Sequence, residues 1–344
     1  MKMHDECIPC LVSQVIKTAH LTGAQDRETL YKQVFAYMAT LDFNKTNPEV
    51  AGDTYAMLKK HIGNEDPYQE VRNYFNNLIL QLLPDIRSKI EAADDPFKAA
   101  LQYASAANII DFSPAHSGEL VTTENVMELM EQATTLPFVI DHTAQLRTDL
   151  SHAKTLLYLG DNCGEICLDK LLIENIKHQN PNLQIYFGVR GAPVVNDSTE
   201  EDAYKVGMNE YATIISNGDI SQGTVIEHTS PEFQEIYHKA DLVIAKGQAN
   251  YETLSDRFDQ NIYFMLITKC KVIANDIGVP ERSLVCLNHH HGHDCLLRQG
   301  LHLFRHPRGA VSRQYHSAGH HRVCRHLGLP TLWLSAHRLG KSGV

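Results

Sequence analysis

The stretch Thr155-Leu-Leu-Tyr-Leu-Gly-Asp-Asn-Cys-Gly-Glu165 predicts a strand, a tight turn and the start of a helix. Its first five residues are apolar and β-prone, as in a strand buried on both faces of a parallel sheet. From Glu165 onward, apolar side chains recur with helical spacing at Ile166, Leu168, Leu171, Leu172 and Ile176. Ligands of parallel sheets bind at the carboxyl ends of the strands, so we expect this turn to hold the functional centre.

The turn itself carries two oxygen-bearing side chains, Asp161 and Asn162. Both would lie beside the N-terminus of the following helix, where anions are favoured. Gly-Asp-Asn is also ordinary turn chemistry between a strand and a helix. The motif alone leaves the two interpretations open, and other residues at the same sheet edge have to decide between them.

From residue 154 onward, strand-like and helix-like segments alternate, which predicts an α/β fold with a mostly parallel sheet and helices on both faces. Helical patterns lie near residues 230–239, 251–259 and 269–278. Besides Thr155–Leu159, the candidate strands are Leu183–Val189, Ala212–Ile215, Asp241–Ala245, Ile262–Ile267 and Ser283–Leu287.

The first part of the chain is predicted to be helical, and we assign residues 1–95 to a helical subdomain. Apolar positions trace one helix around Ile8–Ala19 and a second around Leu30–Leu41. A third should start at Asn47, as its cap, with Pro48 in the first helical position. A fourth over 68–83 should stop at Pro84. Residues 96–288 would then form the α/β domain, which the residues at its strand ends predict to bind metal and phosphate.

Residues 289–344 differ from the rest of the chain in composition. They hold 11 of the 20 histidines, seven Arg, Lys341 and a single acid, Asp294. A histidine-rich metal-handling tail would explain this, but no ligand spacing repeats after His-His-His-Gly-His at 289–293. We favour an atypical end without catalytic residues.

Composition narrows the class of protein. Lys+Arg 31 against Asp+Glu 41 gives a net charge of −10, which argues against general affinity for nucleic acid or an anionic membrane. No apolar run approaches a membrane span, and acids stand where a signal peptide would be apolar, so we expect a soluble cytoplasmic protein. Its eight cysteines should then not form disulfides.

Two further strand ends carry residues that fit the same chemistry. Asp197 follows the strand that ends at Val189, and Lys246 follows the strand that ends at Ala245. Asp161, Asn162 and Asp197 offer the hard oxygen donors that Mg²⁺ or Mn²⁺ prefers. Lys246 would offset phosphate charge. Each residue alone has a plainer explanation, as a helix cap or a surface lysine; their joint placement favours a site for phosphate chemistry.

Three motifs together resemble those of the metal-dependent damage-control phosphatases, long catalogued as a domain of unknown function. They are Gly160-Asp-Asn-Cys-Gly-Glu165, Arg190-Gly-Ala-Pro-Val-Val-Asn-Asp-Ser-Thr199 and Asp241-Leu-Val-Ile-Ala-Lys-Gly-Gln-Ala-Asn-Tyr-Glu252. Cys7-Ile-Pro-Cys10, Asn64-Glu-Asp-Pro-Tyr68 and Ala107-Asn-Ile-Ile-Asp-Phe112 resemble the prokaryotic branch, and the resemblance covers residues 4–287.

The resemblance implies a three-layer α/β/α domain that hydrolyses small phosphorylated metabolites, such as sugar phosphates or damaged phosphometabolites, with a divalent cation (Mg²⁺, Mn²⁺, Co²⁺ or Ni²⁺). It makes Asp161, Asn162 and Asp197 the metal ligands, with Asp161 and Lys246 catalytic and Lys246 at the phosphate. Asn108 and Asp111 would contact the substrate. Glu165 is assigned to the substrate as well, with two alternatives: orienting a ligand or a water, or favouring the helix N-terminus through its charge. Cys163 replaces the usual small residue after Asp-Asn.

Two other functions remain open at this stage. A nucleotide- or cofactor-binding transferase would suit a parallel sheet, but no Gly-x-Gly-x-x-Gly follows a predicted strand. A non-enzymatic metal-binding protein could use Cys7, Cys10 and the histidines. We favour structural or incidental roles for Cys7 and Cys10 over a redox or soft-metal site. The substrate, the metal, the nucleophile and the oligomeric state are not fixed by the sequence.

Overall fold

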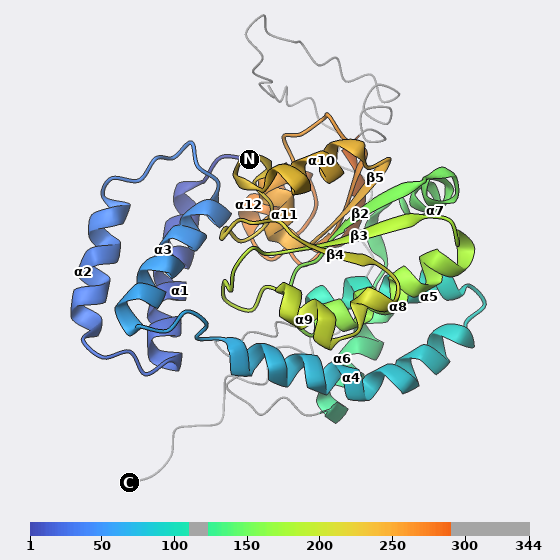
Figure 1. Cartoon of the computed structure of the whole chain (residues 1–344), viewed down its shortest axis with the longest axis horizontal. Helices are drawn as coiled ribbons and strands as arrows, with labels where there is room; N and C mark the ends of the chain where they lie inside the picture. The colour runs from blue at the N-terminus through green and yellow to red at the C-terminus, as the bar shows by residue number, and fades with distance from the viewer. Residues whose placement is uncertain (110–122, 290–344) are drawn as a thin grey trace, which may run out of the picture. The chain divides into compact units, whose positions relative to one another are not determined.

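A seven-stranded sheet lies between two sets of helices in the computed structural model, which describes residues 1–109 and 123–289 (Figure 1). In these ranges the strand order is β1-β7-β6-β5-β2-β3-β4. The strands are β1 (Phe138–Asp141), β2 (Thr155–Leu159), β3 (Gln184–Val189), β4 (Thr213–Ser216), β5 (Leu242–Lys246), β6 (Ile262–Ile267) and β7 (Leu284–Asn288).

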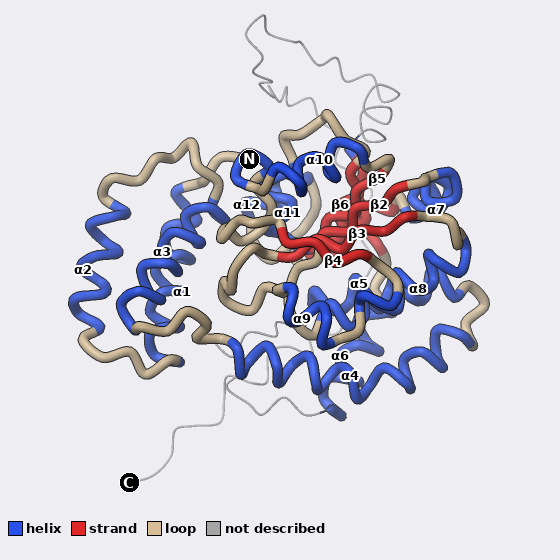
Figure 2. Tube along the Cα trace, viewed as in Figure 1, coloured by secondary structure: helices blue, strands red, loops and turns tan. Residues whose placement is uncertain are grey.

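Five of these strands, from β6 through β5, β2 and β3 to β4, run parallel. β7 is antiparallel to β6, and β1 pairs in parallel with β7, so these two strands run against the others. Figure 2 shows the strands gathered in one central layer with helices on both sides. The predicted three-layer α/β architecture with a mostly parallel sheet is confirmed.

The two faces of the sheet are covered by different parts of the chain. In β2, Leu156 and Tyr158 pack with α4–α9, whereas Leu157 and Leu159 pack with α10–α12. The first set is α4 (Gln69–Glu91), α5 (Pro96–Ala106), α6 (Thr123–Thr134), α7 (Thr143–His152), α8 (Glu165–Gln179) and α9 (Glu200–Lys205). The second set is α10 (Pro231–Lys239), α11 (Gly247–Leu254) and α12 (Lys271–Ile277).

The N-terminal helices α1 (Ile8–Leu21), α2 (Arg27–Met38) and α3 (Asn47–Ile62) share a small core of their own. Val194 and Val195, from the loop after β3, are buried in that same core. The predicted boundary near residue 95 stays a prediction; α4 and α5, which flank it, both pack against α8. Single 3₁₀ turns occur at Asp5–Cys7, Ala107–Ile109, Met208–Glu210 and Ile226–His228.

Several expected element ends were wrong. Pro84 lies inside α4 instead of ending it, because it removes one N–H while buried apolar residues on both sides, such as Leu82 and Ile86, keep the helix on the core. α11 begins at Gly247, directly after β5, and not near residue 251. β1 was not predicted, since it is four residues long and only partly buried.

The cap of α3 also differs from the expectation. Thr46, not Asn47, precedes the first helical residue, and its side chain accepts from the Glu49 backbone N–H. The Glu49 carboxylate in turn accepts from the Thr46 backbone N–H over 2.7 Å, which completes a capping box. In residues 1–109 and 123–289, no helix is long and apolar enough to cross a membrane.

We expect Thr46→Ala to lower the free energy of unfolding by about 1 kcal/mol, because the first turn of α3 loses its side-chain acceptor. Urea unfolding, with hydrogen exchange of the Glu49 amide, measures this. Glu49→Gln is the matched control: a glutamine still accepts from the Thr46 N–H, so the effect should be clearly smaller. Equal effects of the two substitutions would contradict the capping box.

Candidate active site

The site lies where the strand order of the sheet turns around. β3 and β4 lie on one side of β2, and β5 and β6 lie on the other. The loops that leave the carboxyl ends of β2 and β5 therefore diverge, and the space between such loops is the usual binding position in sheets of this kind. Asp161 and Asn162 follow β2, and Gly247 follows β5, so the predicted turn faces this position.

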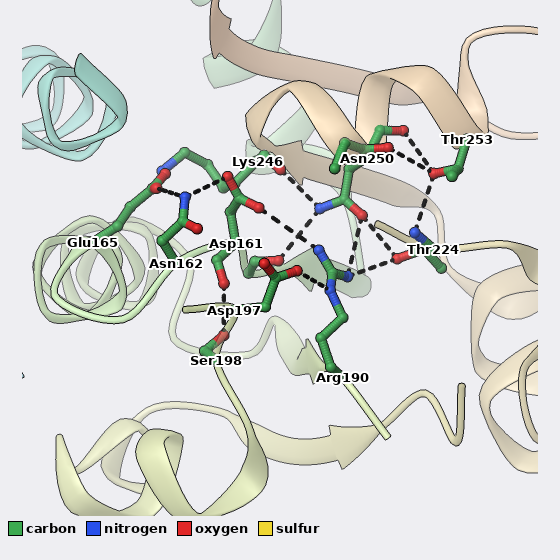
Figure 3. Close-up of polar contacts among 12 residues, drawn as sticks. Asp161, Asn162, Glu165, Arg190, Asp197, Ser198, Thr224, Lys246, Asn250 and Thr253 are labelled. Atoms are coloured by element: carbon green, nitrogen blue, oxygen red, sulfur yellow. Dashed lines mark hydrogen bonds and ion pairs between the residues drawn. The ribbon is translucent and has the colours of Figure 1, made fainter. Parts of the chain in front are cut away.

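The loops after β2 and β3 are joined by backbone hydrogen bonds. The Asp161 carbonyl accepts from the Ser198 backbone N–H over 2.8 Å and from the Ser198 hydroxyl over 3.1 Å. Asn162 and Asp197 form an isolated antiparallel bridge. These contacts bring together all three residues of the predicted ligand set, as Figure 3 shows.

The loop that carries Asp197 is held from outside the sheet by the N-terminal helices. Val195 has a φ of +48°, a conformation that β-branched residues rarely adopt. It persists there because Val194 and Val195 are buried in the core of α1–α3. Lys59 of α3 also donates to the Pro193 carbonyl over 3.2 Å. The helical part thus fixes the approach of one predicted ligand.

The Asp161 carboxylate is almost fully enclosed. Its Oδ2 accepts from the side-chain amides of Asn162 over 2.8 Å and Asn108 over 3.2 Å. Gly247, with a φ of +79°, closes the opposite side: a Cβ built there would stand 1.9 Å from the same oxygen. Only glycine permits both that backbone conformation and that approach. Asn108 also donates to Glu165 Oε2 over 3.1 Å, so this predicted pocket residue links the two acids.

Lys246 has a position that the sequence reasoning did not anticipate. Its side chain is 0% exposed, and Nζ donates to the Ala104 carbonyl over 2.9 Å, to Glu165 over 2.7 Å and to Asp169 over 2.6 Å. An ammonium has three N–H donors, and these three acceptors use all of them. Contact with phosphate therefore stays a prediction for Lys246. In this structure Lys246 instead holds the Glu165 carboxylate in place.

Two cationic residues of the site were missed. Arg190, directly after β3, donates from Nε to Asp197 Oδ2 over 2.6 Å and lies 3.7 Å from Asp161 Oδ1. Lys269 follows β6 at the same sheet edge, and its exposed ammonium lowers the pKa of both Asp161 and Glu165, though less than their nearer neighbours do. In both cases the sequence signal that could have found the residue was a basic side chain just after the carboxyl end of a predicted strand.

The buried charges of the site do not balance. Four carboxyl groups face two cations, Lys246 and Arg190, and 2 − 4 leaves an excess of −2 if all are ionised. The four acids are Asp161, Glu165, Asp169 and Asp197.

The pKa values reflect this excess. Burial, followed by the charges of Glu165 and Asp197, raises the pKa of Asp161 to about 8. Burial also raises the pKa of Asp169 to about 6 and raises that of Asp197 in spite of Arg190. For Glu165, burial alone would raise the pKa, but the charge of Lys246 and the hydrogen bonds from Lys246 and Asn108 together outweigh burial and lower the pKa.

A divalent cation fits this chemistry. Its two positive charges would offset the excess, and the carboxylates of Asp161 and Asp197 are hard oxygen donors within one enclosed cluster. In this structure Asn162 turns its NH₂ group, not its oxygen, toward Asp161 and Glu165. Across residues 1–109 and 123–289, no three His, Cys, Asp or Glu side chains are arranged as a metal site. The predicted ligands are two carboxylates and an amide.

Other predicted residues lie away from this cluster or outside the described part of the chain. Asp111 and the histidine-rich segment 290–344 are outside it. Cys7 is half-buried and Cys10 exposed, and both are free thiols. Burial raises the pKa of Cys7 to about 11, which disfavours the thiolate that redox chemistry or metal binding would need. Their structural or incidental role stays a prediction.

Comparison with known proteins agrees with this geometry. Residues 3–285 match the family described as damage-control phosphatase ARMT1-like domain. A protein of Pyrococcus horikoshii named damage-control phosphatase is 31% identical over 291 residues, which cover 83% of this chain and 98% of that protein. A damage-control phosphatase of Archaeoglobus fulgidus is 32% identical over 83% of this chain and 98% of its own length.

An uncharacterised protein of Methanocaldococcus jannaschii is 33% identical, over 83% of this chain and 95% of its own length. The crystal structure of a DUF89 family protein from Pyrococcus horikoshii superposes with a TM-score of 0.75 at 29% identity, covering 84% of this chain and 99% of the other. Fold and sequence therefore agree: the chain belongs to the damage-control phosphatase ARMT1-like family.

Proposed function

We propose that this protein is a divalent-metal-dependent phosphatase that hydrolyses small phosphorylated metabolites, sugar phosphates or damaged phosphometabolites among them. The observation that carries the proposal is the enclosed cluster of oxygen donors with an excess of two negative charges at the carboxyl edge of the sheet. The family and the names of its relatives support the reaction class. Mg²⁺, Mn²⁺, Co²⁺ and Ni²⁺ are the candidate cations.

In this proposal Asp161, Asn162 and Asp197 hold the cation. When bound, a divalent ion supplies charge neutralisation and polarises the phosphoryl group. The residues around it act on the ligands: Asn108 donates to both Asp161 and Glu165 and so fixes the separation of two acids. Lys246 keeps Glu165 ionised and oriented, because its ammonium donates to the Glu165 carboxylate and lowers the pKa of that acid. The other two donors of Lys246 are bonded to Ala104 and Asp169.

The first test is hydrolysis of para-nitrophenyl phosphate by metal-stripped protein with each of the four cations added back. Asp161→Asn and Asp197→Asn should reduce turnover by about 100-fold or more, since loss of a ligand should exceed the 10–100-fold effect of losing a residue that supports one. Calorimetric titration with Mn²⁺ checks that affinity falls too. Near-normal turnover in either folded variant would refute the ligand assignment.

Gly247→Ala should abolish turnover although it adds only one methyl group, because that methyl would stand 1.9 Å from Asp161 Oδ2. Gly278→Ala is the matched control: Gly278 has a φ of +84° but no atom within 4 Å of its would-be Cβ. Both variants carry similar backbone strain of about 1 kcal/mol, so any larger drop in the unfolding temperature of Gly247→Ala reports the clash with Asp161. If Gly247→Ala keeps its activity, the close approach of the Gly247 backbone to the Asp161 carboxylate is not needed for function.

The two lysines near the site should behave differently when each is replaced by methionine. Lys246→Met leaves two buried carboxylates without their cation, and the loss of stability should be about 3–5 kcal/mol. Lys269→Met should leave the unfolding midpoint nearly unchanged and raise KM, because an exposed ammonium near Asp161 and Glu165 can meet the phosphate. A stable Lys246→Met variant whose only defect is a raised KM would return the phosphate role to Lys246.

A further inference from the structure

Arg190 holds a donor group that the protein does not use. The residue is 3% exposed, and its Nε–H is taken by Asp197. Its Nη1 donates to Thr224 Oγ1 over 3.3 Å and to Asn250 Oδ1 over 3.4 Å. Nη2 is buried and has no hydrogen-bond partner in the described residues. Asp161 Oδ1 is 3.7 Å from it, which is too far for a hydrogen bond.

The used donors hold the guanidinium in one orientation. Thr224 donates its hydroxyl to Asn250 Oδ1 over 2.8 Å, and Asn250 is itself bonded to the backbone carbonyls of Lys246 and Gly160. The plane of the guanidinium is thus set by groups from three separate segments, as Figure 3 shows. A planar fork fixed in this way cannot turn to satisfy its last nitrogen without breaking bonds that it already makes.

An unpartnered donor on a buried charged group is unfavourable, and in native proteins such a group calls for an explanation. Nη2 lies beside Asp161, the residue at the centre of the proposed metal site. Guanidinium groups are well suited to phosphoryl oxygens, which accept short charge-assisted hydrogen bonds from a planar fork. The ammonium of Lys246 has no donor left for that task, and the exposed ammonium of Lys269 is not held in one place.

We propose that Arg190 Nη2 donates to a phosphoryl oxygen of the substrate, and that Asp197, Thr224 and Asn250 hold the guanidinium ready for that contact. This inference rests on the proposed phosphatase function. It gives Asp197 a second task, since one of its oxygens orients the arginine. The plainer alternative is that Arg190 only balances the charges of Asp161 and Asp197. A lysine at this position could still balance charge, but it could not supply the planar fork that the phosphate contact needs.

The test uses the full-length protein loaded with Mn²⁺, and inorganic phosphate as the probe. Arg190→Lys keeps the positive charge beside Asp197 but loses the fork, so the loss of Mn²⁺ affinity should stay at about 10-fold, the lower end for replacing a residue that supports a metal ligand. The inhibition constant of phosphate and the KM of para-nitrophenyl phosphate should rise by about 10-fold to 100-fold, as expected when a charge-assisted hydrogen bond is lost. Thr224→Val, which removes one acceptor that orients the fork, should change the same constants in the same direction by less.

Arg72→Lys is the matched control. Arg72 is likewise buried, at 2% exposure, but its donors are taken by Asp66 and Asp202, which are not among the proposed metal ligands. This variant should lose stability and leave the phosphate inhibition constant of the folded protein unchanged.

Two results would overturn the inference. The first is a phosphate inhibition constant in Arg190→Lys within error of that in Arg72→Lys. The second is a loss of Mn²⁺ affinity in Arg190→Lys that equals its loss of phosphate affinity, because that result is expected if Arg190 only balances charge. In both cases a wild-type protein that hydrolyses para-nitrophenyl phosphate leaves the proposed function standing. A metal-loaded wild type that neither binds phosphate nor hydrolyses the ester refutes the function and the inference together.

Discussion

The buried ammonium of Lys246 is the contact on which the site depends. It joins β5 to α8 through Glu165 and Asp169, and to α5 through the Ala104 carbonyl. Burial alone would lower the pKa of Lys246, but the two carboxylates outweigh it and raise the pKa, so the lysine stays charged. A buried charge of this kind is tolerated only when its partners satisfy every donor. Replacing Lys246, or either of its two acids, leaves a buried charge without its partner. The loss of stability should therefore be much larger than that from one missing hydrogen bond.

The residues proposed to hold the cation depend on a second constraint, the pairing of two neighbouring loops. The backbone of Asp161 is bonded to Ser198, and Asn162 is bridged to Asp197, so the loops after β2 and β3 are held together. The N-terminal helices bury Val194 and Val195 and thereby hold the second loop. The helical part therefore contributes to the geometry of the site without placing a side chain in it, through the strained backbone at Val195.

Much of this was predictable from sequence, and the failures have physical reasons. β2 and β6 were predicted to the residue, because apolar runs of five or six residues between turn signals have few other interpretations. The carboxyl ends of β2, β3 and β5 do meet, as parallel topology requires. The contacts of Lys246 could not be predicted from the sequence, since its partners Glu165 and Asp169 lie 81 and 77 residues away and only the pairing of β5 with β2 brings them together. In the sequence, Arg190 belongs to a Gly/Pro turn. Its role in the site could not be predicted, because its acceptors Thr224 and Asn250 come from distant segments of the chain.

The distance along the chain between Lys246 and its acids has a consequence for synthesis. Glu165 and Asp169 leave the ribosome 81 and 77 residues ahead of the lysine that neutralises them. β5, which carries it, enters the sheet between two strands that lie far apart in sequence, β2 and β6. A nascent chain that ends before β5 has two carboxylates on the inner face of α8 and no cation to bury with them. Burying that face earlier would require the two acids to take up protons, so full docking of α8 is disfavoured at neutral pH until β5 has been made.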